Sequence, residues 1–258
     1  MIEDGKSMSD ELLMLFVCRS DSISLEGLHE ILQRYGIKSA DDSRHINDYE
    51  FFHHACCNEH VDEAMIQFLI DVSPDAASVI SVHRQTPLHA ACCNKNATPC
   101  IIRILIDAHP SSRQVVDEEG DMPLHCFCRG RSNNDSEAIE ILKILLKDCS
   151  FSTKHANNKG RLPIHVASIS KSSEFCGLLI DAYPGSERMP RDEHGALPFH
   201  LAVRNNDIAT IEYLYKLYPE ALNCPLTFRT DKVFPIFMAI TRLNHRDDDE
   251  REGVQSML

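Results

Sequence analysis

The tetrapeptide Thr86-Pro87-Leu88-His89 decides the fold, because variants of it recur along the 258-residue chain. Each variant places a proline before an apolar residue and a histidine, and the clear copies are Met122-Pro123-Leu124-His125, Leu162-Pro163-Ile164-His165 and Leu197-Pro198-Phe199-His200. Successive prolines lie 36, 40 and 35 residues apart, and degenerate copies flank the set at Phe51-Phe52-His53-His54 and Phe234-Pro235-Ile236-Phe237. A period of this length predicts similar structural units that bury their apolar surface against their neighbours.

The residues around each copy predict a turn followed by two helices. The turn comes first, because Asp or Asn begins and Gly ends a four-residue segment at 117–120, 157–160 and 192–195. Proline at the first helical position then predicts a short helix over 87–94. The pair Thr98-Pro99 starts a second helix, whose apolar residues recur at helical spacing: Ile101, Ile102, Leu105 and Ile106. A proline 19 to 21 residues after the motif histidine is expected to close the second helix, at Pro74, Pro110, Pro184 and Pro219.

The pattern Asp-x-x-Gly-x-x-Pro-Leu-His, followed by a small-residue helix and a Leu/Ile-rich helix, resembles the ankyrin repeat. The resemblance covers about residues 45 to 241 and implies an all-α, ankyrin-type helical solenoid of stacked helix-turn-helix units. It also implies a protein partner and no catalytic activity. The chain departs from the family pattern before the proline, where only Thr86 keeps the usual threonine. We therefore expect the threonine–histidine link of the family to be mostly lost, with apolar contacts in its place.

The array is expected to be flanked by two different segments. Residues 1–44 are expected to form a divergent N-terminal capping unit with helices over 11–19 and 25–35, because terminal repeats are usually atypical. Residues 45–243 form the expected repeat array. Residues 244–258 are rich in charge and are expected to be a disordered tail.

Two stretches inside the array depart from the repeat pattern. The segments 129–135 and 219–235 are longer than their counterparts, so we expect longer turns there. The last copy carries Phe237 in the histidine position, and no apolar second helix follows it. Four apolar side chains are therefore expected to face outward at that end, partly covered by the tail: Met238, Ala239, Ile240 and Leu243.

Composition limits the partners and the compartment. The net charge of −13 argues against nucleic acid, which requires clustered Lys and Arg. The longest early apolar run, 12–18, is far shorter than the roughly 20 residues that span a bilayer, and the acidic N-terminus does not fit a secretory signal. Eleven cysteines, an odd number, favour a reduced intracellular setting over a disulfide framework. We expect a monomer in the cytoplasm, with the nucleus left open.

The motif histidines and the cysteines could suggest a metal or redox site. The motif histidines occur once per unit, so they cannot all contact one reacting atom. They are His53, His89, His125, His165 and His200. Cys56, Cys92 and Cys128 also recur once per unit, and packed helices lie about 8–10 Å apart, whereas zinc needs ligands within about 2.3 Å. We therefore interpret the cysteines as buried packing residues and expect no metal or cofactor. A metal or redox role would rest mainly on the off-register residues Cys57, Cys93 and Cys126.

The resemblance implies an interaction scaffold or adaptor that binds another protein on its concave, turn-tip face. Two alternatives stay open: a regulatory ankyrin fragment of a larger enzyme, and a Cys/His metal- or redox-dependent protein. In the family, contacts come mainly from turn tips and from the exposed end of the first helix. By motif position, the tip residues are His83, Gln85, Glu118, Glu119, Asp121, Asn158, Lys159, Arg161, Glu193 and His194, and the helix-end residues are Asn94, Arg129 and Arg204. The tips alternate in charge, which favours a protein partner of mixed charge over nucleic acid.

Overall fold

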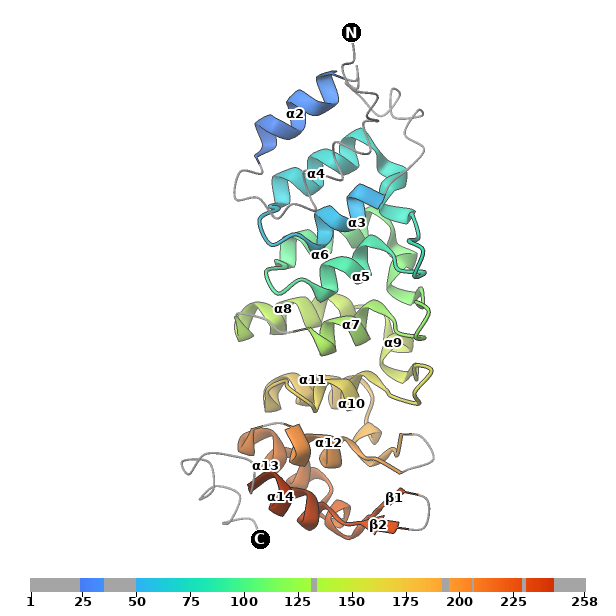
Figure 1. The fold of residues 1–258 in the computed structure, drawn as a ribbon, viewed down its shortest axis with the longest axis vertical. Coiled ribbons are helices and arrows are strands. Elements are labelled where there is room, and N and C mark those ends of the chain that lie inside the picture. Colours follow the sequence, from blue (N-terminus) through green and yellow to red (C-terminus); the bar gives the residue numbers. More distant parts are fainter. Residues whose placement is uncertain are drawn as a thin grey trace. The chain divides into compact units, whose positions relative to one another are not determined.

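The computed structural model describes residues 24–34, 50–130, 134–191, 195–205, 207–228 and 231–243. These residues are mostly helical, and Figure 1 shows pairs of short helices that follow one another along the chain. The predicted fold class, an all-α ankyrin-type helical solenoid, is confirmed. The chain divides into two compact units, and the first comprises Met1–Glu118 and Met122–Leu145 while the second comprises Glu119–Asp121 and Leu146–Leu258.

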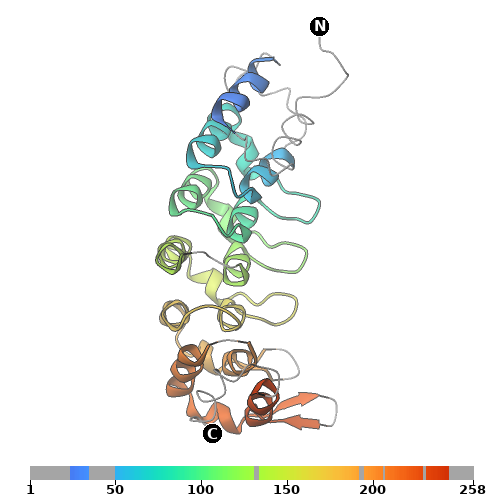
Figure 2. The ribbon, with the colours of Figure 1, turned by 60° about the vertical axis from the view of Figure 1, so that its left-hand side comes forward.

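The first unit builds two layers of helices. Its elements are α2 (Leu25–Arg34), α3 (Glu50–Cys57), α4 (Glu63–Val72), η2 (Pro74–Ser78), α5 (Pro87–Cys93), α6 (Pro99–Ala108), η3 (Pro110–Gln114), α7 (Pro123–Arg129) and α8 (Asp135–Leu146). Helices α3, α5 and α7 pack side by side in one layer, and α2, α4 and α6 follow one another in the other (Figures 1 and 2). Each α-helical pair therefore buries its apolar surface against the next pair.

The second unit repeats this arrangement. Its elements are α9 (Ser150–Lys154), α10 (Pro163–Ala167), α11 (Ser173–Ala182), η4 (Ser186–Arg188), α12 (Pro198–Asn205), α13 (Ile208–Leu217), η5 (Pro219–Asn223), β1 (Leu226–Phe228), β2 (Asp231–Val233) and α14 (Pro235–Leu243). Helix α12 packs against α10 on one side and α14 on the other, while α11 packs against α13. Strands β1 and β2 form an antiparallel hairpin in which Leu226 faces Val233.

The helices begin where their capping residues predict. The side chain of Thr98 accepts a hydrogen bond from the Ile101 amide (3.3 Å), which confirms the predicted start of α6 at Pro99. Asp62 and Asp207 cap α4 and α13 in the same way. The predicted first helix over 87–94 is confirmed to within one residue.

The core is the apolar stripe that each helix turns toward its neighbours. In the first unit Leu88, Ile102 and Leu105 are almost completely buried, as are Phe175 and Leu214 in the second. Burial of a side chain of this size contributes about 1.5–3 kcal/mol. Because consecutive units supply this burial to one another, the array stabilises helices that are too short to be stable alone.

Several expectations need correction. Pro74, Pro110 and Pro219 do not simply end a helix, because each starts a one-turn 3₁₀ helix after the second helix has ended. The segment 219–235, expected to be a long turn, contains η5 and the β1–β2 hairpin. The expected helix over 25–35 is α2, which ends at Arg34, whereas the expected helix over 11–19 lies outside the described residues, as does the tail 244–258.

Helix α14 faces outward only in part. Ile240 is exposed as expected, but Ala239 is buried and Met238 is half-buried. The side chain of Leu243 lies outside the described residues. The reason for the difference is that α14 packs against both α12 and η5, so one side of the helix belongs to the core of the second unit.

The turns before the first helices require a left-handed backbone residue. Gly120, Gly160 and Gly195 occupy this position with φ of 73°, 68° and 71°. In the turn before α5 the same position holds Arg84, with φ of 60°. A residue with a Cβ pays about 1–2 kcal/mol in this region, so Arg84 stores strain that the glycines avoid.

Arg84→Gly should therefore raise the free energy of unfolding by about 0.5–1 kcal/mol, because the strain disappears and the exposed arginine side chain contributes little packing. Urea unfolding followed by circular dichroism measures this change. The matched control is Gly195→Ala, since the nearest atom to an added Cβ, the Pro225 carbonyl oxygen, is 4.0 Å away and only backbone strain is introduced. The control should lower the free energy of unfolding. If Arg84→Gly also lowered it, the left-handed backbone conformation at Arg84 would not be a source of strain.

Candidate functional site

The turn before α5 is held by hydrogen bonds between its two arms. The Ser81 amide donates to the Gln85 carbonyl (2.9 Å), and the Arg84 amide donates to the Ser81 carbonyl (2.9 Å). The Gln85 amide also donates to the Ser81 side chain (3.2 Å). The backbone of this turn is thus fixed, and its tip extends away from the helix ends (Figure 2).

In the first unit this turn is joined to the start of the next one. The Glu118 amide donates to the His83 carbonyl (3.2 Å), and His83 Nδ1 lies 3.3 Å from Glu118 Oε2. Nearer the helices, Gln85 Nε2 donates to Asp117 Oδ2 (3.2 Å). Neighbouring turns therefore support each other, and their tips form a preorganised surface.

The second unit repeats this contact with different side chains. The Asn158 amide donates to the Glu119 carbonyl (3.0 Å), and Lys159 Nζ lies 2.7 Å from Glu119 Oε2. Asn157 Oδ1 accepts hydrogen bonds from the amides of Lys159 and Arg161, which shapes the turn from within. Lys159 and Glu119 are both more than half exposed, so their ion pair contributes little stability.

Most of the described residues predicted as tips lie on this surface. Exposed side chains are His83, Glu118, Glu119, Asn158 and Lys159, whereas Gln85 and Arg161 are half-buried. The helix-end residues Arg129 and Arg204 are exposed. Glu193 and His194 lie outside the described residues.

Two of the predicted site residues have structural roles. Asp121 is fully buried, and its carboxylate accepts a hydrogen bond from Asn157 Nδ2 (2.7 Å), so the expectation that it is an exposed tip residue is wrong. Asn94 Nδ2 donates to the carbonyls of Cys56 (3.2 Å) and Asn58 (3.0 Å). The physical reason is the same for both: the side chain satisfies a polar group of a neighbouring repeat that would otherwise be buried without a partner.

Two exposed aliphatic residues were missed. Val82, at the tip of the turn before α5, is 79% exposed, and Ile80, two residues earlier, is 54% exposed. The equivalent tip positions hold the polar residues Glu118 and Asn158. This difference between repeats could have identified Val82 from the sequence. An aliphatic residue at a position that is polar in the other repeats is not needed for packing in a solvent-exposed turn.

The motif histidines act as bridges between repeats. His165 Nδ1 accepts from the Leu162 amide (3.2 Å), and its Nε2 donates to the Met189 carbonyl (2.8 Å). His200 makes the same pair of bonds with the Leu197 amide (3.1 Å) and the Cys224 carbonyl (2.7 Å). An amide can only donate and a carbonyl can only accept, so both rings are neutral with the proton on Nε2.

Loss of the threonine before the proline removes only part of the expected polar link to the motif histidine. Thr86 adds a side-chain contact to His89, with Oγ1 2.8 Å from Nδ1. Its backbone amide also donates to that nitrogen (3.0 Å), and Met122 keeps this second bond to His125 (3.2 Å). The polar link is therefore preserved by the backbone at the positions where the threonine is lost.

The cysteines that recur once per unit are buried thiols. Cys56, Cys92, Cys128 and Cys176 are buried, while Cys57, Cys93 and Cys100 are exposed, and none of these forms a disulfide. Burial raises the pKa of the Cys56 thiol well above its ordinary value, with a further increase from Cys57. Burial also raises the pKa of Cys176 to about 12. Thiols of this kind are poor nucleophiles, which fits the packing interpretation.

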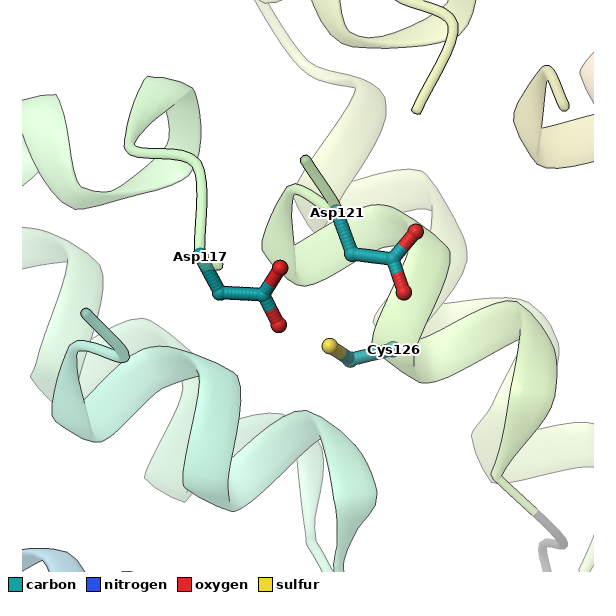
Figure 3. Close-up of side chains that lie close together, drawn as sticks. All are labelled: Asp117, Asp121 and Cys126. Atoms are coloured by element: carbon teal, nitrogen blue, oxygen red, sulfur yellow. The ribbon is translucent and has the colours of Figure 1, made fainter. Parts of the chain in front are cut away.

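One group of metal-ligating side chains lies close together among the described residues. Asp117, Asp121 and Cys126 each place a ligand atom within 4.8 Å of the others (Figure 3). Both carboxylates already accept amide hydrogen bonds, from Gln85 and Asn157 respectively. The grouping is explained by hydrogen bonding of the turn, and we assign no metal to it.

None of the described helices is both long enough and apolar enough to cross a lipid bilayer.

The fold and the repeated turns define a class of helical repeat proteins, and comparison with known proteins gives the family. A family model described as ankyrin repeats (3 copies) matches residues 95–187 and 132–225, which together span slightly more than half of the chain. The chain belongs to the ankyrin repeat family.

Two known proteins are similar to this chain, one in sequence and one in fold. A curated ankyrin repeat protein of Rickettsia conorii is 46% identical over 43 residues, which are 17% of this chain and 61% of that protein. A solved chain covers 83% of this one with a TM-score of 0.58 and 15% identity, and 99% of its own length is matched. It comes from a structure described as a predatory endopeptidase from Bdellovibrio bacteriovorus in complex with an immunity protein. At this identity the likeness shows the fold alone.

The buried histidines make stability depend on pH. Burial lowers the pKa of His200 below its ordinary value of 6.5, although its bond to the Cys224 carbonyl opposes the shift. The unfolded state therefore takes up a proton before the folded state does. The contribution of neutral His200 is fully present above about pH 6.5 and is lost as the pH falls from there through the lowered folded-state pKa.

Thermal melts at pH 7.5 and pH 5.5 test this for the wild type and for His200→Gln, because glutamine does not titrate. The variant should be less stable at pH 7.5, and the difference in melting temperature from the wild type should shrink at pH 5.5. An equal difference at both pH values would contradict the lowered pKa.

Proposed function

We propose that this chain is a non-catalytic protein–protein interaction scaffold or adaptor that binds its partner on the turn-tip face. Ankyrin repeats are generally protein-interaction modules and are generally not enzymes, which supports the class of function. The observation that carries the choice of surface is the exposed pair Ile80 and Val82 on a turn whose backbone is fixed by hydrogen bonds.

The chemistry of this surface suits a protein ligand. Val82 lies in the turn and Ile80 lies two residues before it, so together they provide apolar contact area near the tip. The neighbouring pair of His83 and Glu118 supplies a polar border. Apolar anchors with a polar border are the usual composition of the energetically important part of an interface. A turn that is already ordered loses little conformational entropy when it binds.

The turns of the second unit provide a second, charged set of contacts. Glu119 and Lys159 present opposite charges at the tip, and Asn158 adds hydrogen-bonding groups. Such a surface recognises a partner of mixed charge. It does not offer the continuous basic stripe that nucleic acid requires, and the net charge of −13 also opposes binding to phosphates. We place this function in the cytoplasm, with the nucleus left open.

Val82→Asp should weaken partner binding at least tenfold, because it puts a charge in the apolar anchor. A partner captured from native cell extract and then purified allows the affinity to be measured by calorimetry. The matched control is Phe151→Asp in α9, which places the same charge on another exposed apolar residue, 55% exposed and outside the turns. Both variants should melt within about 3 °C of the wild type, since exposed substitutions usually change stability by less than about 0.5 kcal/mol.

Equal loss of affinity in both variants would remove the turn before α5 from the binding surface. The turns of the second unit are tested separately by the double variant Lys159→Glu and Arg161→Glu. If these turns contribute, the double variant should bind more weakly and its affinity should depend differently on salt concentration. If affinity and salt dependence both stay unaltered, the charged contacts lie elsewhere.

A further inference from the structure

Arg84 occupies a strained backbone position in a solvent-exposed turn. Its φ of 60° lies in the left-handed region, where the equivalent positions hold Gly120, Gly160 and Gly195. The hydrogen bond from the Arg84 amide to the Ser81 carbonyl (2.9 Å) closes the turn and holds Arg84 in this conformation. Strain that persists although glycine would relieve it is a feature of functional positions. The side chain of Arg84 is therefore a candidate for a functional contact.

The Arg84 guanidinium is available for such a contact. Arg84 is exposed, and within the described parts of the chain its side chain takes part in no hydrogen bond or ion pair. The neighbouring residue His83 already has a partner, since its Nδ1 lies 3.3 Å from Glu118 Oε2. Arg84 therefore presents all of its guanidinium N–H donors, in a rigid planar fork, to a group that approaches the tip.

We propose that Arg84 binds a carboxylate of the protein partner, from an aspartate or glutamate that lies next to apolar residues in the partner. This inference rests on the proposed function, because it concerns the same turn. A guanidinium forms two parallel hydrogen bonds with a carboxylate, and such charge-assisted pairs are stronger than neutral hydrogen bonds. Val82 (79% exposed) and Ile80 (54% exposed) precede Arg84 by two and four residues and provide the apolar contact beside the carboxylate.

The aliphatic neighbours strengthen the pair of guanidinium and carboxylate. A partner that covers Val82 also removes water from around the adjacent charges, and the attraction between opposite charges increases as the local dielectric constant falls. The backbone of the turn is already fixed, since the Ser81 amide donates to the Gln85 carbonyl (2.9 Å), so little ordering is required on binding. An arginine beside an apolar anchor is typical of the residues that dominate the binding energy of an interface.

A carboxylate fits this turn better than a phosphate group or a small molecule. One guanidinium balances one negative charge, whereas a phosphate group carries nearly two at neutral pH. The excess would be repelled by the exposed carboxylate of Glu118 and by a chain whose net charge is −13. Sites for small molecules are concave, whereas this turn extends away from the helix ends (Figure 2). The carboxylate is therefore assigned to a polypeptide.

Peptides selected from a random library displayed on phage serve as the probe. The wild-type chain should select peptides in which an acidic residue lies next to an aliphatic or aromatic one. In calorimetry with one selected peptide, Arg84→Gly should weaken binding by about tenfold or more, which is the effect of losing a charge-assisted pair. The same variant should unfold at a higher urea concentration, because the backbone strain is removed. Weaker binding by a more stable protein cannot result from unfolding.

Two further variants control for charge and for geometry. Arg103→Gln removes another exposed positive charge of the first unit, on α6 and outside the turns, and should bind the peptide as the wild type does. Arg84→Lys keeps the charge and the left-handed residue but loses the planar fork, so it should recover only part of the affinity.

Replacing the acidic residue of the peptide by its amide tests the pair itself. This change should weaken binding to the wild type by a similar factor and should have little further effect in Arg84→Gly, because both changes remove the same contact. Fully additive effects would overturn the proposal, as would selection of peptides without acidic residues. Tighter binding of a peptide that carries phosphoserine at that position would overturn the assignment to a carboxylate.

Val82→Asp distinguishes failure of this inference from failure of the proposed function. If Arg84→Gly keeps full affinity for a peptide that Val82→Asp no longer binds, the carboxylate inference is wrong and the turn remains the binding surface. If both variants bind the peptide as the wild type does, the choice of this turn as the binding surface is wrong as well.

Discussion

The fold depends on a buried, neutral histidine that uses its two ring nitrogens in opposite ways. In His165 and His200, Nδ1 accepts from the backbone amide at the start of its own helix, and Nε2 donates to a carbonyl 24 residues further along the chain. A buried amide or carbonyl without a partner would cost about 1–3 kcal/mol, and one ring satisfies one of each. The group that donates to Nδ1 at the start of each helix is a backbone amide. Leu162 and Leu197 can therefore stand in place of threonine and keep this hydrogen bond.

These bridges determine where the turns lie. A carbonyl fixed by an imidazole fixes the segment that leads into the next turn, and successive turns then hydrogen bond to each other within each unit. The second unit shows how this order extends outward, from buried Asp121 and Asn157 to the exposed pair of Glu119 and Lys159. The position of the turn-tip surface that we propose as the binding site is thus a consequence of buried polar contacts, and its exposed ion pairs contribute little to stability.

Much of this architecture could be predicted from the sequence, because it follows from local chemistry with a fixed period. Proline after Thr98 starts α6 as the capping pattern requires, and the motif period predicts the family. Features that depend on contacts between residues far apart in the sequence could not be predicted. The burial of Asp121 depends on an amide 36 residues away, and the 3₁₀ turns at Pro74 and Pro110 require backbone geometry that residue type alone does not specify.

The candidate binding surface shows the same division. Charged tip residues such as Glu119 and Lys159 could be located by motif position, since a repeat places equivalent residues in equivalent turns. Val82 could not be located in that way, because its importance lies in its difference from the equivalent residues. The exposure of Ile236 and Ile240 on α14 likewise becomes informative only when it is compared with burial at the same motif positions elsewhere.

The tautomer of the bridging histidines tests most directly whether these bridges hold the repeats together. Long-range proton–nitrogen correlation spectra at pH 7.5 distinguish a ring protonated at Nε2 from one protonated at Nδ1 or at both nitrogens, and assignment by single His→Gln variants identifies each residue. We expect His165 and His200 to be neutral and to carry the proton on Nε2. A proton on Nδ1 in either ring would contradict it, because the amide at the start of the helix would then face a second donor.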